Sequence, residues 1–111
     1  MILNQEIQSR LSEMQDLFKH YGVTCASLFG SCLKDRFSAT SDVDVLVEFD
    51  FQMDPIDKGT ALLALESDLE HLLHRKVDLV SYSAIRNPYF LSEVNETRLI
   101  VYGTTIEKAI A

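Results

Sequence analysis

A glycine–serine pair followed by two closely spaced aspartates is the part of this sequence best suited to chemistry. Gly30 and Ser31 are followed, after ten intervening residues, by Asp42 and then Asp44. Glycine lets the backbone approach a ligand closely, and a serine hydroxyl can donate a hydrogen bond to a phosphate oxygen. Carboxylates at positions i and i+2 of a strand project from the same face, where both can reach divalent metal ions. The pattern predicts a site for metal-assisted phosphoryl or nucleotidyl transfer.

A third acid, Asp78, stands inside an apolar run with strand character, Val77 to Val80. A carboxylate among apolar residues is costly to bury unless it is paired or bound to metal. If this strand lies beside the strand of Asp42 and Asp44, Asp78 completes a cluster of three carboxylates. It would then ligate one metal and accept the proton of an attacking hydroxyl. The alternative is an edge strand that simply exposes Asp78 to solvent.

The hydrophobic pattern indicates the elements that must position these residues. Apolar side chains spaced by three and four residues are typical of helices, whereas strict alternation from Asp42 to Phe49 indicates a strand. The second long helix is expected to bury a leucine stripe, namely Leu62, Leu65, Leu69 and Leu72, widened by Leu63 and Leu73. We expect helices over residues 3–20, 31–37, 59–74 and 88–95, and strands over 23–29, 42–49, 76–82 and 99–102.

This order of elements, α-β-α-β-α-β-α-β, predicts one domain over residues 1–111. The fold class is α/β (α+β), with a single mixed β-sheet covered by helices. Residues 50–58 are expected to form a polar connection between the second strand and the helix that follows it.

Composition narrows the classes of function. The net charge of −7 disfavours direct binding to a nucleic-acid backbone and suits a basic partner or a metal-carried anion. No apolar run is long enough to span a membrane, and the first residues lack the basic region and apolar run of a signal peptide, so we expect neither a membrane span nor a signal peptide. Cys25 and Cys32 form no CxxC pair, so we expect free thiols and a cytoplasmic location.

The spacing of Gly30, Ser31, Asp42 and Asp44, with Asp78 in a later strand, resembles the active-site pattern of the DNA polymerase beta nucleotidyltransferase superfamily. The short chain looks in particular like a minimal nucleotidyltransferase (MNT) domain, with the match covering about residues 7–102. The resemblance implies the polymerase-beta-like nucleotidyltransferase fold. It also implies that the Gly-Ser pair holds the nucleotide phosphates, and that the three aspartates bind two Mg²⁺ ions, the third acting as base.

Many proteins of this kind are MntA-type antitoxins, which transfer AMP from ATP to a tyrosine of a HEPN-domain ribonuclease toxin. The resemblance therefore implies a Mg²⁺-dependent adenylyltransferase that acts as antitoxin in a hetero-oligomer. The HEPN toxin would be a separate chain, since no Arg-x4-His motif is found here: Leu91 stands five residues after Arg86. Two alternatives stay open, which are an antitoxin that neutralises its partner by binding alone, and nucleotidyl transfer to a small molecule.

Other polar residues are expected to have no catalytic role. His71 and His74 have the spacing of zinc ligands, but no further ligand is at hand, and we expect both to face solvent. Glu48 shares the predicted face of Asp42 and Asp44 and is interpreted as a solvated strand end. The family often has Arg-Gly shortly after the Gly-Ser pair, whereas this chain has Lys34-Asp35-Arg36. The extra acid is expected to weaken nucleotide binding, although Lys34 and Arg36 keep positive charge nearby.

Overall fold

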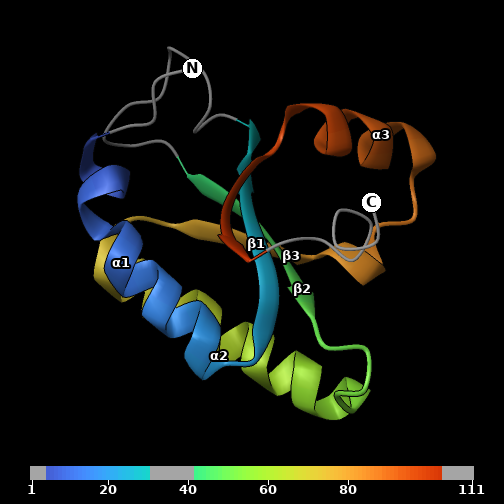
Figure 1. Cartoon of the computed structure of the whole chain (residues 1–111), viewed down its shortest axis with the longest axis horizontal. Coiled ribbons are helices and arrows are strands. Elements are labelled where there is room, and N and C mark those ends of the chain that lie inside the picture. The colour runs from blue at the N-terminus through green and yellow to red at the C-terminus, as the bar shows by residue number, and fades with distance from the viewer. Residues whose placement is uncertain (1–4, 31–41, 104–111) are drawn as a thin grey trace.

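A mixed, four-stranded β-sheet forms the centre of the molecule (Figure 1). The computed structural model describes residues 5–30 and 42–103. The strands lie in the order β3-β2-β1-β4, in which β1 is antiparallel to β2 and β4, and β3 is parallel to β2. Their bounds are Val23–Phe29 (β1), Val43–Phe49 (β2), Val77–Ser81 (β3) and Leu99–Gly103 (β4).

Helices cover both faces of this sheet. On one face lie α1 (Gln5–His20) and α2 (Pro55–Leu73), and on the opposite face lies α3 (Pro88–Thr97) (Figure 1). A short 3-10 helix, η2 (Tyr82–Ala84), follows β3. The predicted class, a single mixed sheet covered by helices, is confirmed.

The main core lies between the sheet and the pair α1 and α2. The side chains of β2 that face these helices are valines and a phenylalanine. Each helix contributes three fully or almost fully buried residues at helical spacing, namely Ile7, Met14 and Phe18 from α1 and Leu65, Leu69 and Leu73 from α2. One expectation was wrong, because Leu63 does not widen the buried stripe and is 73% exposed. Its place on the helix turns it away from the sheet, one residue past the partly buried Leu62.

The start of α2 also differs from the prediction, because the helix begins at Pro55 and not near Gly59. Asp54 acts as the N-cap, and its Oδ1 accepts a hydrogen bond of 2.8 Å from the backbone N–H of Ile56. Proline at the first helical position needs no hydrogen bond there and is already set to a helical φ. The segment that was interpreted as a polar connection is therefore half helix.

Side chains from the helices bond the backbone of the two outer strands. Glu70 Oε2 accepts from the N–H of Val77 at 2.9 Å, and Glu66 Oε2 accepts from the N–H of Leu79 at 3.3 Å. These bonds hold β3 at the two residues that flank Asp78. At the other side of the sheet, Gln15 Nε2 donates to the carbonyl of Val101 at 2.9 Å.

The predicted strands agree closely with the structure, whereas one predicted helix cannot be compared with it. The strand predicted at 23–29 matches β1 residue for residue, and the other three strands agree within one residue at each end. The short helix expected over 31–37 lies outside the described residues. Within residues 5–30 and 42–103, none of the helices combines the length and apolar character that a membrane crossing requires.

Candidate active site

Asp42 and Asp44 lie at the start of β2, on the sheet face opposite α1 and α2. Asp42 directly precedes the strand and Asp44 is its second residue, and both side chains are half-buried. Val43 and Val45, which alternate with them, are fully buried in the main core. Because the buried valines fix the strand's register, the two carboxylates are held on the same side.

Asp78 is brought next to this pair by the sheet. In the parallel pairing of β2 with β3, the Cα of Asp44 is opposite the Cα of Asp78. Neighbouring strands are about 4.8 Å apart, and residues in register point to the same face. The predicted condition for a three-carboxylate cluster, a β3 that lies beside β2, is thus met. The alternative holds in part as well, since β3 is an outer strand and Asp78 is exposed.

The three carboxylates suit a hard divalent cation by chemistry and backbone register. Oxygen donors are what Mg²⁺ prefers, and like charges held on adjacent strands repel until a cation offsets them. Their side chains are not gathered as they stand, because among residues 5–30 and 42–103 no group of three or more His, Cys, Asp or Glu side chains could hold a metal ion. The backbone register thus places Asp44 and Asp78 at neighbouring positions on one face of the sheet.

Gly30 directly follows β1 and lies beside Asp44. Its φ of +67° lies in the left-handed region, which residues with a Cβ rarely adopt. A Cβ at this position would collide with Oδ2 of Asp44 and would lie 3.3 Å from its Cγ. Glycine is therefore needed both for the turn and for the space that the carboxylate fills. Its predicted companion, Ser31, lies outside the described residues.

Next to the carboxylates, the same face becomes apolar and is covered by α3. Phe29 of β1 is the register partner of Asp44. Phe29, Leu46 and Val94 form a second buried cluster, against which Val80, Tyr82 and Ile85 are packed. The site thus lies at the border between an acidic area and an apolar area.

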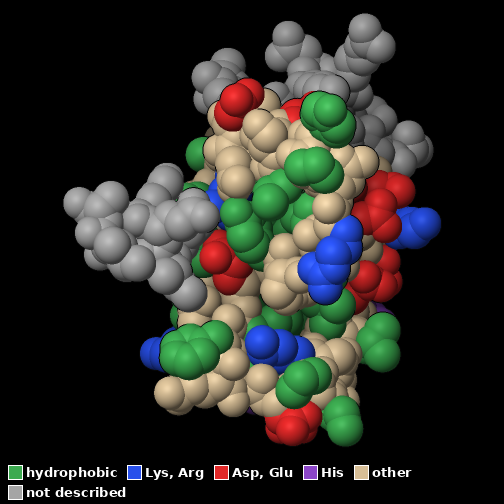
Figure 2. Space-filling model, turned by 90° about the vertical axis from the view of Figure 1, so that its right-hand side faces the viewer, with side chains coloured by type: hydrophobic (Ala, Val, Ile, Leu, Met, Phe, Trp, Pro, Cys, Tyr) green, Lys and Arg blue, Asp and Glu red, His purple; other side chains and the backbone are tan. Residues whose placement is uncertain are grey.

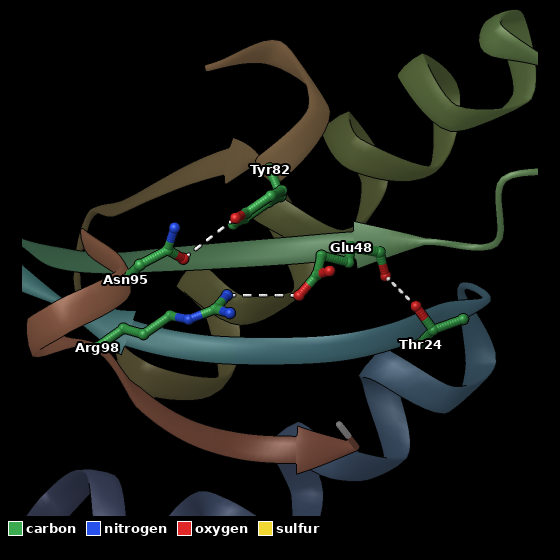
Figure 3. A network of polar contacts seen from close by, with 5 residues as sticks. All are labelled: Thr24, Glu48, Tyr82, Asn95 and Arg98. Atoms are coloured by element: carbon green, nitrogen blue, oxygen red, sulfur yellow. Dashed lines mark hydrogen bonds and ion pairs between the residues drawn. The ribbon is translucent and has the colours of Figure 1, made fainter. Parts of the chain in front are cut away.

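A polar network at the other end of this face was not expected from the sequence (Figure 3). Arg98 Nη1 lies 3.4 Å from Glu48 Oε2, and the two side chains are only 6% and 15% exposed. The Arg98 guanidinium also lies over the ring of Tyr82, 5.2 Å from its centroid, and the Tyr82 hydroxyl donates to Asn95 Oδ1 at 3.1 Å. The interpretation of Glu48 as a solvated strand end was wrong, since its partner comes from a segment 50 residues later. This network joins β2 to the end of α3 and the residue that follows it.

The structure tests what was expected of Cys25 and of the two histidines on α2 and just after it. Cys25 is a buried free thiol, and burial raises its pKa to about 11, with the nearby Glu48 carboxylate acting in the same direction. The thiol is therefore protonated at neutral pH. His71 and His74 are both exposed, as expected.

Comparison with known proteins agrees with this arrangement. Residues 12–107 match the family described as "Polymerase beta, Nucleotidyltransferase". Protein adenylyltransferase MntA of Thermococcus cleftensis is 34% identical over 88 residues, which cover 78% of this chain and 85% of the relative.

Two solved structures share the fold. One is described as a toxin-antitoxin with AMP-PNP; it has a TM-score of 0.70 and 22% identity, covering 90% of this chain and 78% of that one. The other is a tri-AMPylated Shewanella oneidensis HEPN toxin in complex with MNT antitoxin; it has a TM-score of 0.66 and 21% identity, covering 93% and 77%. Shared fold, family match and the carboxylates beside Gly30 lead to one conclusion: this chain belongs to the polymerase beta nucleotidyltransferase family.

Proposed function

We propose that this chain is a Mg²⁺-dependent protein adenylyltransferase that transfers AMP from ATP to a hydroxyl of a partner protein. The observation that carries the proposal is the register of Asp44 opposite Asp78, directly beside the turn at Gly30. A relative of this chain bears the name protein adenylyltransferase, and one protein of the same fold is described with an ATP analogue.

The carboxylates have distinct places in the proposed reaction. Asp42, Asp44 and Asp78 would hold the metal ions that carry the triphosphate, and Gly30 with Ser31 would hold the phosphate oxygens. Bound Mg²⁺ supplies charge neutralisation at the phosphates and at the leaving pyrophosphate. Asp78 accepts the proton as the acceptor oxygen forms its bond to the α-phosphorus, and the bond between that phosphorus and the bridging oxygen of pyrophosphate breaks. Asp78 suits a base because it lies at the outer strand, open to an incoming hydroxyl.

We further propose that the acceptor is a tyrosine of a HEPN ribonuclease toxin, and that the chain acts as its antitoxin in a cytoplasmic hetero-oligomer. Support comes from the proteins of the same fold, one of which is described as an AMPylated HEPN toxin in complex with its MNT antitoxin. The net charge of −7 suits a partner with a basic surface.

The direct test is transfer of label from α-labelled ATP to a HEPN-domain protein, sought among the reading frames next to this one and purified as a separate chain, with and without Mg²⁺. Wild type should label the partner only with Mg²⁺, and Asp44→Asn should lose at least about 100-fold in rate, because a metal ligand is removed. Asp16→Asn is the matched control, because it makes the same chemical change at an exposed site on α1. No transfer by wild type, or equal transfer by Asp44→Asn, refutes the enzymatic proposal.

The non-catalytic alternative is separated by growth of cells that express the toxin. If the double variant Asp42→Asn/Asp44→Asn still rescues growth while it transfers no label, neutralisation works by binding alone. If rescue is lost while a complex still forms, neutralisation requires the chemistry.

A further inference from the structure

The sheet face that bears the carboxylates changes from acidic to apolar along β2 and β3. Two residues after Asp44 and Asp78, the next positions on this face are Leu46 and Val80, which are again in register. Leu46 is buried, whereas Val80 is only partly covered. The border between the two areas is therefore one step of the strand pleat wide, or about 7 Å.

An aromatic pair stands at this border. Phe29, the register partner of Asp44, packs edge-on against Phe90 of α3, with ring centroids 5.9 Å apart and planes at 71°. Phe29 is 8% exposed, but Phe90 keeps 37% of its surface exposed. Figure 2 looks at the side of the molecule on which α3 lies, and hydrophobic side chains reach the surface there among charged ones. Phe90 is thus partly open to solvent, and it contacts Phe29, whose register partner in the sheet is Asp44.

We propose that Phe90, supported from behind by Phe29, binds the base of the nucleotide by stacking. This inference rests on the proposed function, since the carboxylates and Gly30 are taken to hold the triphosphate. A nucleoside triphosphate has a strongly charged end and a flat, weakly polar end. The face has the same sequence of properties, carboxylates for metal and phosphates followed by a partly exposed aromatic wall.

Stacking of a base on one aromatic side chain makes a known contribution to binding affinity and selects little between bases. Removing such a ring weakens binding by about 5- to 150-fold per base. Every base has a flat face, so the contact accepts adenine and guanine alike. We therefore expect Phe90 to contribute affinity for nucleotides without choosing between ATP and GTP.

The chain supplies a matched control one residue away. Tyr89 lies in the same first turn of α3 but is 86% exposed, and Asn87 Oδ1 caps the backbone N–H of both Tyr89 and Phe90. Replacing Tyr89 therefore removes an aromatic ring from the same turn without touching the wall beside Phe29. Phe90→Leu keeps an apolar side chain against Phe29 and loses only the flat ring, which guards against a variant that fails to fold.

The experiment measures binding of three probes, Mg²⁺·ATP, Mg²⁺·GTP and Mg²⁺·tripolyphosphate, by calorimetry, with thermal unfolding as a check of the fold. Phe90→Leu and Phe90→Ala should weaken both nucleotides by about 5- to 150-fold, whereas tripolyphosphate, which has no base, should bind as it does to wild type. Tyr89→Leu should leave all three probes unchanged. Equal loss for all three probes in folded Phe90 variants, or no loss for the nucleotides, overturns the inference.

A different result of the same experiment would refute the proposed function itself. If wild type binds neither Mg²⁺·ATP nor Mg²⁺·tripolyphosphate, the site proposal is wrong. If wild type binds both, and Asp44→Asn binds neither, but Phe90→Leu binds ATP normally, only the inference about the base is wrong.

Discussion

Replacing Gly30 by alanine separates the two demands that the structure places on this residue. The first is conformational, because a φ of +67° costs a residue with a Cβ roughly 1–2 kcal/mol. The second is steric, because the new methyl group would occupy the space of Asp44 Oδ2 and push the carboxylate away. We expect Gly30→Ala to lower the free energy of unfolding by about 1–2 kcal/mol. It should also weaken Mg²⁺·ATP binding by about 10- to 100-fold, the usual effect of displacing a metal ligand through its neighbour.

Gly22→Ala is the matched control for this experiment. Gly22 has a φ of +80°, so alanine meets a similar strain there. Its Cβ would meet only the terminal methyl of Met53, at 2.7 Å, which a flexible side chain can move aside. Urea unfolding should give similar losses for the two variants, and calorimetry should show weaker Mg²⁺·ATP binding for Gly30→Ala alone. If both variants bind Mg²⁺·ATP equally well, the claim that Gly30 makes room for Asp44 is refuted.

Three further outcomes follow from the described contacts. Asp78→Asn removes one of two like charges on adjacent strands, so without metal it should leave the free energy of unfolding unchanged or raise it by up to about 1 kcal/mol. Mg²⁺ should then raise the thermal midpoint of this variant less than that of wild type, and a larger shift would contradict a metal site shared by Asp44 and Asp78. Glu48→Ala leaves the nearly buried Arg98 without its carboxylate and should cost about 1.5–3 kcal/mol in urea unfolding, whereas Glu13→Ala, in an exposed ion pair, should cost less than about 0.5 kcal/mol. The raised pKa of Cys25 means that its thiol stays protonated in the folded state while it ionises in the unfolded one, so the free energy of unfolding should fall as pH rises from about 9 towards about 11. This dependence on pH should be weaker in Cys25→Ala, and an unchanged dependence would assign it to other groups.

Local patterns predicted most of the elements, because each depends on neighbours in sequence. Alternation located β2 within one residue, and Asn87-Pro88 marked the start of α3 correctly. The start of α2 was missed because the cap at Asp54 comes before any apolar periodicity begins. Pro55 lies within the segment expected to be a polar connection, but proline is equally suited to the first turn of a helix.

The candidate site likewise contains residues that local sequence patterns predict and residues whose place depends on the tertiary fold. Gly30, Asp42 and Asp44 are close in sequence, so their spacing alone indicated a common site. The place of Asp78 depends on strand order, which no local pattern determines. The pair of Glu48 and Arg98 was missed for the same reason, since the two residues are brought together only by the packing of β4 and α3 on the sheet. An arginine directly after a helix gave no signal of its own.

The glutamates of α2 that bond β3, and the glutamine of α1 that bonds β4, bear on how this protein can associate. Unpaired backbone groups on outer strands invite another chain to add a strand to the sheet. Here, carboxylates occupy the outward N–H groups of Val77 and Leu79, and an amide occupies the carbonyl of Val101. Intruding backbone would first have to displace these side chains. Recognition by other proteins is thereby directed to side-chain surfaces, and fibre-like growth through the sheet is discouraged.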